Sequence, residues 1–190
     1  MQRPGHYPGA FCYSAPMSEI SIRGVRAGDL PAIARIYAEA VRHGTASFEI
    51  EPPDEAEMVR RYRALCAQDY PYLVAELAGT VAGYAYAGPY RARPAYRWTV
   101  EDSIYIAPEF HRRGIGARLL VRLIADAKAG GFRQMIAVIG DSAQTASIAV
   151  HAAAGFATIG TLRSVGFKHG KWLDTVLMQR ALGTGDTAPP

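Results

Sequence analysis

A short basic turn that contains two glycines stands near the middle of the chain. It reads Arg112-Arg113-Gly114-Ile115-Gly116 and follows an apolar, β-branched run, Ser103–Ile106, that stops before Pro108. After the turn, apolar residues from Ala117 to Lys128 recur at helical spacing. A strand, a turn and a helix in this order place unpaired backbone N–H groups and a helix dipole at the turn, which favours an anion, and the glycines let a phosphate approach the backbone. The sequence therefore predicts a loop that binds a phosphorylated ligand.

The known kinds of phosphate loop narrow the identity of this ligand. The turn lacks the Gly-Lys-Ser/Thr ending of a P-loop, and Gly114-Ile115-Gly116-Ala117-Arg118-Leu119 lacks the third glycine of a dinucleotide fingerprint. The alternative is a turn without a ligand, in which the glycines serve only the backbone conformation before an amphipathic helix. The pattern instead resembles the coenzyme A pyrophosphate loop of the GCN5-related N-acetyltransferases, Q/R-x-x-G-x-G/A, with His111 at the leading position. This resemblance implies acetyl-CoA as the cosubstrate and no metal.

Longer motifs extend the resemblance over roughly Ile20 to Leu182. The run Arg97–Ile106 is similar to the W-T-x-E-x-(S/T)-x-Y-V run of the phosphinothricin-type N-acetyltransferases, and Gly160–Asp174 matches that family too. Val100–Ser103 and Gly140–Ser142 are more similar to its bacterial L-methionine sulfoximine/sulfone branch. The resemblance implies direct acetyl transfer to the α-amine of a small amino acid or amino-acid analogue.

The expected reaction assigns a role to one carboxylate. Acyl transfer from a thioester to an amine needs a base, hydrogen-bond donors for the oxyanion and a proton for the leaving thiolate. The matching family glutamate makes Glu101 the base, and a partly apolar cleft would raise its pKa. The alternative is a strand-end carboxylate in a salt bridge with Arg97. Asp102 points to the opposite face by strand alternation, so it is the weaker candidate.

The expected proton donor is His151. It lies four residues before Gly155, where the phosphinothricin-type enzymes have a histidine and many members of the wider superfamily have a tyrosine. A neutral imidazole can donate or relay a proton to the thiolate. The alternative is a packing residue on an alanine-rich helix.

The resemblance also implies which residues bind the cofactor. Pantetheine is expected to lie along the strand before the loop and to contact its backbone, as an added strand would. In this arrangement Tyr105 could serve only as a core aromatic, and Gln144 stands where this branch usually has Asn. The expected cofactor-binding residues are Ile104, Tyr105, Ile106, Arg112, Arg113, Gly114, Ile115, Gly116, Ala117 and Gln144.

Two arginines precede the expected base and suit the acceptor. Arg91 and Arg93 lie two apart, and guanidinium forks match a substrate carboxylate. The alternative is a pair of solvated loop arginines. The expected substrate-binding residues are Arg91, Arg93, Tyr96, Glu101 and Lys168, with Phe48 and Trp172 as further candidates for the pocket wall.

Hydrophobic periodicity predicts the elements that position these residues. The expected strands are Ile20–Arg23, Tyr72–Leu77, Val81–Ala87, Trp98–Ile106, Met135–Ile139, Phe156–Phe167 and Lys171–Arg180. The expected helices are one capped by Asp29, then Asp54–Ala67, Ala117–Lys128, and one from Asp141 or Ser142 to Ala154. The order β-α-α-β-β-β-α-β-α-β-β is that of the GCN5-related acetyltransferase domain. It predicts an α/β (α+β) fold with a mixed, mostly antiparallel central sheet flanked by helices.

Length and composition set the outer limits. The 190 residues suit one domain, 17–182, between a disordered extension, 1–16, and a flexible tail, 183–190. The net charge of +4 suits an anionic cofactor, but no basic stripe with interleaved aromatics indicates nucleic-acid binding. No run approaches the roughly 20 apolar residues of a membrane helix. Cys12 and Cys66 have neither metal nor disulfide spacing, and Cys66 is expected in the core, so a reducing, cytoplasmic setting is expected.

Other functions stay open at this point. The same fold could acetylate protein N-termini or lysines, which a groove without arginines would favour. A non-catalytic acyl-CoA-binding module would lack the glutamate base, and a nucleic-acid binder is the last alternative. Because the family commonly forms dimers along its closing strands, the resemblance implies a homodimer acting on a small-molecule amine.

Overall fold

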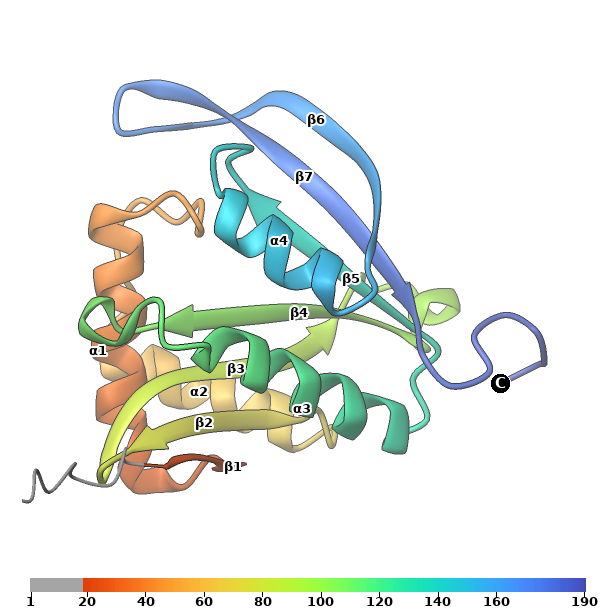
Figure 1. The fold of residues 1–190 in the computed structure, drawn as a ribbon, viewed down its shortest axis with the longest axis horizontal. Coiled ribbons are helices and arrows are strands. Elements are labelled where there is room, and N and C mark those ends of the chain that lie inside the picture. The colour runs from red at the N-terminus through yellow and green to blue at the C-terminus, as the bar shows by residue number, and fades with distance from the viewer. Residues whose placement is uncertain (1–18) are drawn as a thin grey trace, which may run out of the picture.

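The computed structural model describes residues 19–190, so the predicted extension, 1–16, and Cys12 lie outside the described residues. The described chain follows the predicted order of strands and helices (Figure 1). The strands are β1 (Ile20–Gly24), β2 (Tyr72–Leu77), β3 (Thr80–Pro89), β4 (Thr99–Ile106), β5 (Gln134–Gly140), β6 (Ala157–Lys168) and β7 (Lys171–Ala181). The helices are α1 (Leu30–His43), α2 (Glu55–Cys66), α3 (Ile115–Ala129) and α4 (Thr145–Ala153).

The strands form one mixed sheet in the order β1-β2-β3-β4-β5-β7-β6. Its neighbours pair antiparallel except β4 and β5, which are parallel. That parallel pair is short, because only Thr99–Asp102 of β4 and Gln134–Ala137 of β5 are in register. Beyond it β4 continues beside β3 and β5 beside β7, so the two strands diverge. The predicted mixed, mostly antiparallel sheet is confirmed.

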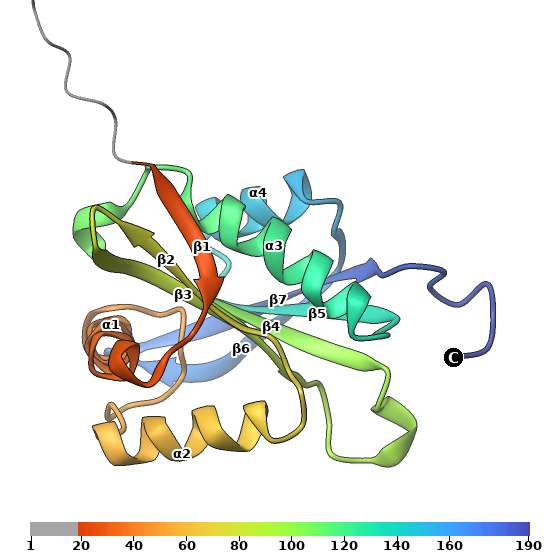
Figure 2. The same cartoon turned by 90° about the horizontal axis from the view of Figure 1, so that it is seen from below.

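Helices cover both faces of this sheet. Figure 2 shows α1 and α2 on one side, and α3 and α4 on the other. Strand alternation sends the side chains of β4 into both layers: Val100 and Ile104 pack with the α3 layer, and Tyr105 packs with the α1 layer. Glu101 and Asp102, although adjacent in the chain, therefore face opposite sides of the sheet.

The ends of three helices are stabilised in different ways. The Asp54 side chain accepts a hydrogen bond from the Glu57 N–H at the start of α2, and Gly155 has a positive φ just beyond α4. Asp29 lies just before α1, but its carboxylate accepts from the Arg26 N–H and pairs with Arg23. Asp29 therefore occupies the predicted N-cap position of α1, but its side chain makes no capping hydrogen bond, because its oxygens accept from Arg23 and from the Arg26 N–H.

Two further sequence predictions are corrected. Cys66 is exposed rather than in the core, because α2 packs through Met58, Tyr62 and Leu65, and the next residue turns toward solvent. The fourth helix begins at Thr145, not at Asp141 or Ser142. Asp141 instead has a φ of +77° and its carboxylate accepts from the Ala143 N–H, which makes a turn before the helix.

The end of the chain forms turns after β7. The Gly185 N–H donates to the Leu182 carbonyl, and the Arg133 guanidinium donates to the Pro189 carbonyl at 2.9 Å. The division into one domain, 17–182, and a tail, 183–190, stays a prediction.

Candidate active site

The predicted phosphate loop leads from β4 into α3. Gly114 is the N-cap of α3 with a φ of +75°, and Arg112 also has a positive φ, of 62°. The first backbone hydrogen bond of the helix runs from the Arg118 N–H to the Gly114 carbonyl, so the N–H groups of Ile115, Gly116 and Ala117 precede it. A Cβ at Gly114 would have nothing within 4 Å, so the loop surface is open to a ligand. This end of α3 can hold an anion.

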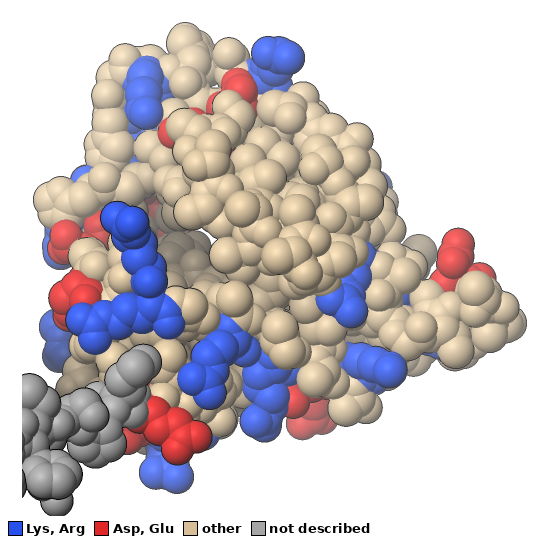
Figure 3. All heavy atoms as spheres, viewed as in Figure 1, with Lys and Arg blue, Asp and Glu red and all other residues tan. Residues whose placement is uncertain are grey.

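The leading histidine of the loop has a structural partner. His111 Nε2 lies 2.9 Å from the Ile106 carbonyl, which ties the loop to the end of β4. The Arg113 guanidinium lies over the ring of Phe110 at 5.5 Å. Figure 3 shows Lys and Arg side chains gathered over the region of this loop and α3, beside a hollow in the surface.

A cleft of about 70 Å³ lies where β4 and β5 diverge. Its lining includes Ile104 and Tyr105 of β4, Val138 and Gly140 of β5, and Gln144 at the N-cap of α4. Since β5 leaves β4 after Asp102, backbone groups on this edge of β4 have no ladder partner there. They are available to amide groups of a ligand.

The side chains of the expected pantetheine-binding residues point elsewhere. Ile104 and Ile106 pack against the α3 layer, and the Tyr105 ring meets Tyr37 edge-on at 5.0 Å. Gln144 Nε2 donates to Thr45 Oγ1 at 3.1 Å. Any contact of Ile104, Tyr105 and Ile106 with the cofactor is therefore made by their backbone.

Glu101 lies on the α1/α2 side of the sheet and is half-buried. Burial and the nearby negative charge of Asp102 raise the pKa of Glu101 to about 7, although Arg91 acts in the opposite direction. Among the described residues no cation forms a salt bridge with Glu101, and Arg97 instead lies over the ring of Trp98. A carboxylate with a pKa near 7 is suited to proton abstraction at neutral pH.

His151 and Asp102 form a buried pair on the other side of β4. Their side chains, 5% and 2% exposed, meet with 2.9 Å between Nε2 and Oδ2. His151 Nδ1 lies 2.8 Å from the Ser147 carbonyl, and because a carbonyl only accepts, Nδ1 carries hydrogen. Burial acts to lower the pKa of His151, but the hydrogen bond and charge of Asp102 raise it overall.

Asp102, the weaker candidate from the sequence, lies at the cleft. Its Oδ1 atom is buried without a hydrogen-bond partner among the described residues, and the residue lines the cleft together with His151. Strand alternation placed it correctly, away from Glu101. The contact with His151 crosses 49 residues of sequence, so only the fold could show it.

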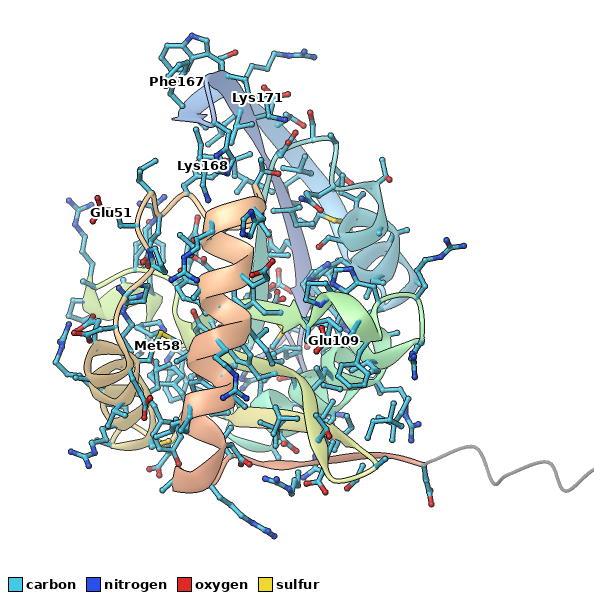
Figure 4. All side chains as sticks on the ribbon, turned by 90° about the vertical axis from the view of Figure 1, so that its left-hand side faces the viewer. Glu51, Met58, Glu109, Phe167, Lys168 and Lys171 are labelled. Carbon is cyan, nitrogen blue, oxygen red and sulfur yellow. The ribbon has the colours of Figure 1, made fainter. Side chains whose placement is uncertain are left out.

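The expected acceptor residues fall into two places. Arg91, Arg93 and Tyr96 are exposed on the segment between β3 and β4, and Arg91 is close enough to lower the pKa of Glu101. The Arg91 guanidinium also lies over the ring of Tyr90 at 5.1 Å. Lys168 is only 3% exposed, at the end of β6, and its Nζ donates to the Ser47 carbonyl at 2.7 Å (Figure 4). The structure thus brings Arg91 toward Glu101 and engages Lys168 with a backbone carbonyl.

The loop after α1 also borders the cleft, and the only residue of this loop that the sequence indicated was Phe48, as a candidate for the pocket wall. Ala46 lines the cleft, and Thr45 donates to Asp141 at 3.0 Å. The Phe48 ring occupies space that only glycine leaves: a Cβ at Gly166 would lie 2.3 Å from it and one at Gly140 would lie 2.9 Å from it. Gly140 and Gly166 were the sequence features that could have indicated this contact, because each permits close packing of a ring from a distant segment.

Residues 19–190 contain neither a cluster of metal-binding side chains nor a membrane-spanning helix. No group of three or more His, Cys, Asp or Glu side chains in this range is placed to hold a metal ion. No helix in it combines the length and apolar character needed to cross a membrane.

Known proteins match this chain over most of its length. Residues 33–156 match the Acetyltransferase (GNAT) family. The chain is 56% identical over 170 residues to a phosphinothricin N-acetyltransferase of Alcaligenes faecalis, which covers 90% of this chain and 86% of the relative. It is 41% identical to an L-methionine sulfoximine/L-methionine sulfone acetyltransferase of Pseudomonas paraeruginosa, over 89% of this chain and 98% of the relative.

A solved structure shows the same fold with a ligand. It is a GNAT superfamily phosphinothricin acetyltransferase from Sinorhizobium meliloti in complex with acetyl-CoA. The two chains are 49% identical with a TM-score of 0.88, and the match covers 90% of this chain and 92% of the other. The fold, the loop and these relatives together show that the chain is an acetyltransferase belonging to the GNAT family.

Proposed function

We propose that this protein transfers the acetyl group of acetyl-CoA to the α-amine of a small amino acid or amino-acid analogue of the phosphinothricin, methionine sulfoximine or methionine sulfone type. The observation that carries the proposal is a carboxylate with a pKa of about 7, Glu101, on the strand that also borders the cleft and leads into the phosphate loop. Relatives named for these reactions share most of the chain.

Acetyl-CoA binds along β4 and the start of α3. The diphosphate meets the free N–H groups of Ile115, Gly116 and Ala117, with Arg112 and Arg113 supplying positive charge. The pantetheine amides meet the unpaired backbone edge of β4, at Ile104, Tyr105 and Ile106, and Gln144 borders the same cleft. The open surface at Gly114 fits a bulky anion.

The chemistry divides between the two sides of β4. Glu101 takes a proton from the acceptor ammonium, directly or through a water, and the neutral amine attacks the thioester carbonyl. The C–N bond forms, the attacking nitrogen loses its second proton to solvent, the C–S bond breaks, and the leaving thiolate takes a proton from His151, which regains one from solvent. The hydrogen bond from Asp102 orients His151, and the charge of Asp102 favours the protonated imidazole, which suits a proton donor.

The acceptor carboxylate is held by Arg91 and Arg93. Both arginines are exposed on the segment between β3 and β4, and Arg91 acts electrostatically on Glu101. Tyr96 lies on the same segment. Lys168 supports the acceptor side through the loop after α1, since its ammonium donates to the Ser47 carbonyl.

We also propose a homodimer in the cytoplasm. Large apolar side chains are exposed on β6 and near the start of β7. They are Ile159, Leu162, Val165 and Phe167 on β6, and Trp172 on β7. A contiguous exposed apolar surface on an edge strand favours association with a partner. The cytoplasmic setting rests on the cysteine content alone.

A thiol-release assay with acetyl-CoA tests the function. Free amino acids, methionine sulfone, methionine sulfoximine and phosphinothricin are compared with their amides. The amides should have kcat/KM lower by about 10- to 100-fold, because a charge-assisted Arg–carboxylate hydrogen bond contributes about 1.5–3 kcal/mol.

Glu101→Gln should lower kcat by about 10²–10⁴, the usual contribution of a general base.

The control is Glu109→Gln, which removes an exposed carboxylate beyond the end of β4 (Figure 4) and should leave kcat unchanged. Absence of thiol release with every free amino acid would contradict the proposed function. Equal use of acids and amides would favour a protein amine as the acceptor.

A further inference from the structure

The cleft between β4 and β5 passes from one face of the sheet to the other. Ala46, in the loop after α1, lines it on one side, and His151 of α4 lines it on the other. Figure 2 shows α1 and α4 on opposite faces of the sheet. A thioester held in this cleft can therefore meet an amine on the α1 side while its sulfur lies on the α4 side.

The proposed base stands just outside the cleft. Glu101 is still within the short parallel ladder, opposite Ile136, and the lining on β4 begins at Asp102. Ser103 is the first residue beyond the ladder, and strand alternation places its side chain on the same face as that of Glu101. Of these two side chains on the α1 face, only that of Ser103 belongs to a residue that borders the cleft.

The other hydrogen-bond donors of the lining are turned elsewhere. The Gln144 amide donates to the loop after α1, and the ring of Tyr105 is packed into the α1 layer. Ser147 and His151 belong to α4, on the opposite face, where the imidazole meets the Ser147 carbonyl. The Ser103 hydroxyl is thus the side-chain donor of the lining that remains on the face of the base.

A tyrosine of the neighbouring strand supports this hydroxyl. Tyr86 lies directly opposite Ser103 in the β3–β4 ladder, where side chains of facing residues are close together. Burial raises the pKa of Tyr86 and the charge of Glu101 adds to this effect, whereas the Ser103 hydroxyl acts in the opposite direction. The phenol therefore keeps its proton at neutral pH and can donate it to Ser103 Oγ, which leaves the serine proton for an acceptor in the cleft.

We propose that Ser103 is a catalytic residue whose hydroxyl donates a hydrogen bond to the thioester oxygen in the transition state, and that Tyr86 is its positioning residue. This inference rests on the proposed function, because it needs the thioester in the cleft and the amine on the face of Glu101. When the amine nitrogen attacks the carbonyl carbon, one electron pair of the C=O bond moves to the oxygen. Ser103 stabilises this oxyanion and keeps its own proton, and the pair returns to the C=O bond as the C–S bond breaks.

Loss of the hydroxyl should slow the reaction without weakening the binding of acetyl-CoA. Ser103→Ala should lower kcat by about 10²–10³, the usual effect of removing one oxyanion donor. The Kd for acetyl-CoA, measured by calorimetry, should be unchanged, because the charge on the oxygen develops only in the transition state. Ser103→Thr keeps the hydroxyl on a side chain that suits a strand and should restore most of the rate. Tyr86→Phe should lower kcat less than Ser103→Ala does.

The control is Ser21→Ala. Ser21 is likewise a serine on a strand of this sheet, but it is exposed on β1, at the edge of the sheet, and its replacement should leave kcat unchanged. A Ser103→Ala protein with the kcat of the parent would overturn the inference. A Ser103→Thr protein as slow as Ser103→Ala would do the same, because the hydroxyl would then not be the group that matters.

A pH series distinguishes an oxyanion donor from a proton relay. The rise of the rate near pH 7 that is expected from Glu101 should persist in Ser103→Ala, because the base is intact. Loss of this rise would mean that Ser103 carries the proton of the amine to Glu101, and it would overturn the oxyanion role.

The choice of acceptor separates this inference from the proposed function, because an oxyanion forms with any amine. Acetylation of a protein amine but of no amino acid, with the full effect of Ser103→Ala, would contradict the proposed acceptor and support the role of Ser103. Acetylation of amino acids without that effect would leave the function standing and overturn the inference. Absence of thiol release with every amine would contradict both.

Discussion

At the scale of single residues, two adjacent carboxylates of β4 have different surroundings because they alternate across the strand. Glu101 faces the α1/α2 side, where the acceptor is proposed, and Asp102 meets His151 on the α4 side. The negative charge of Asp102 favours the protonated form of both neighbours. It therefore raises the pKa of Glu101 and that of His151 together.

Asp102→Asn should shift the whole pH profile of kcat/KM to lower pH. With the proposed roles, the rate should rise as Glu101 loses its proton, near pH 7 in the parent, and fall as His151 loses its proton. Without the charge of Asp102 both pKa values fall, because each protonated form loses its stabilisation. Arg91 and Tyr86, which also face Glu101, are unchanged by the substitution. A pH series of kcat/KM under subsaturating amine measures both limbs.

The control for this experiment is Ser147→Ala. It removes the hydroxyl 3.5 Å from His151 Nδ1 but keeps the backbone carbonyl at 2.8 Å, so its profile should match that of the parent. If Asp102→Asn lowers the rate equally at every pH, Asp102 contributes only to the packing of α4, and the link between the two sides of β4 is wrong.

At the scale of elements, the start of α3 is where the diphosphate of the donor is proposed to bind. Gly116 is the second residue of the helix, and a Cβ there would have only Ile106 Cγ1 nearby, at 3.9 Å. Gly116→Val should therefore fold but block the approach of a phosphate to the free N–H groups. The KM for acetyl-CoA should rise by about 10- to 100-fold, which corresponds to the loss of a hydrogen bond to a charged group. Steady-state kinetics with varied acetyl-CoA measure the change.

Ala125→Val provides the comparison for this substitution. It adds the same β-branched side chain to an exposed position of α3, far from the N-terminus of the helix, and should leave the KM for acetyl-CoA unchanged. A folded Gly116→Val protein with the KM of the parent would remove the diphosphate from this loop.

The sequence predicted elements well where local signals decide the structure. Hydrophobic periodicity gave the order of strands and helices, and alternation along β4 put Glu101 and Asp102 on opposite faces. Contacts between distant segments could not be predicted in this way. Thr45 meets Asp141 across 96 residues and Lys168 meets Ser47 across 121, and no local pattern encodes these pairs.

At the scale of the whole molecule, the β6–β7 hairpin extends beyond the helical layers (Figure 1). Its tip is joined to the loop after α1 by the Lys168 ammonium and by His169, whose Nε2 lies 3.3 Å from the Gly44 carbonyl. The same loop contributes Ala46 to the cleft. A partner that covers the hairpin would therefore contact an element that is attached to the lining of the cleft.

The exposed apolar surface of this hairpin leads to a prediction about assembly. Phe167 and Trp172 are 57% and 65% exposed and meet edge-on at 5.3 Å, so together they present a broad aromatic surface to solvent. Burial of this surface between two copies would gain about 25 cal/mol per Å² of apolar area. Light scattering at micromolar concentration should give twice the 20.5 kDa chain mass, and Trp172→Asp should give the monomer, because a buried unpaired carboxylate is costly.

Val121→Asp tests the specificity of this effect, since Val121 is 63% exposed on α3 and its replacement should leave the dimer intact. A parent protein with the monomer mass at this concentration would show that the aromatic surface serves another purpose.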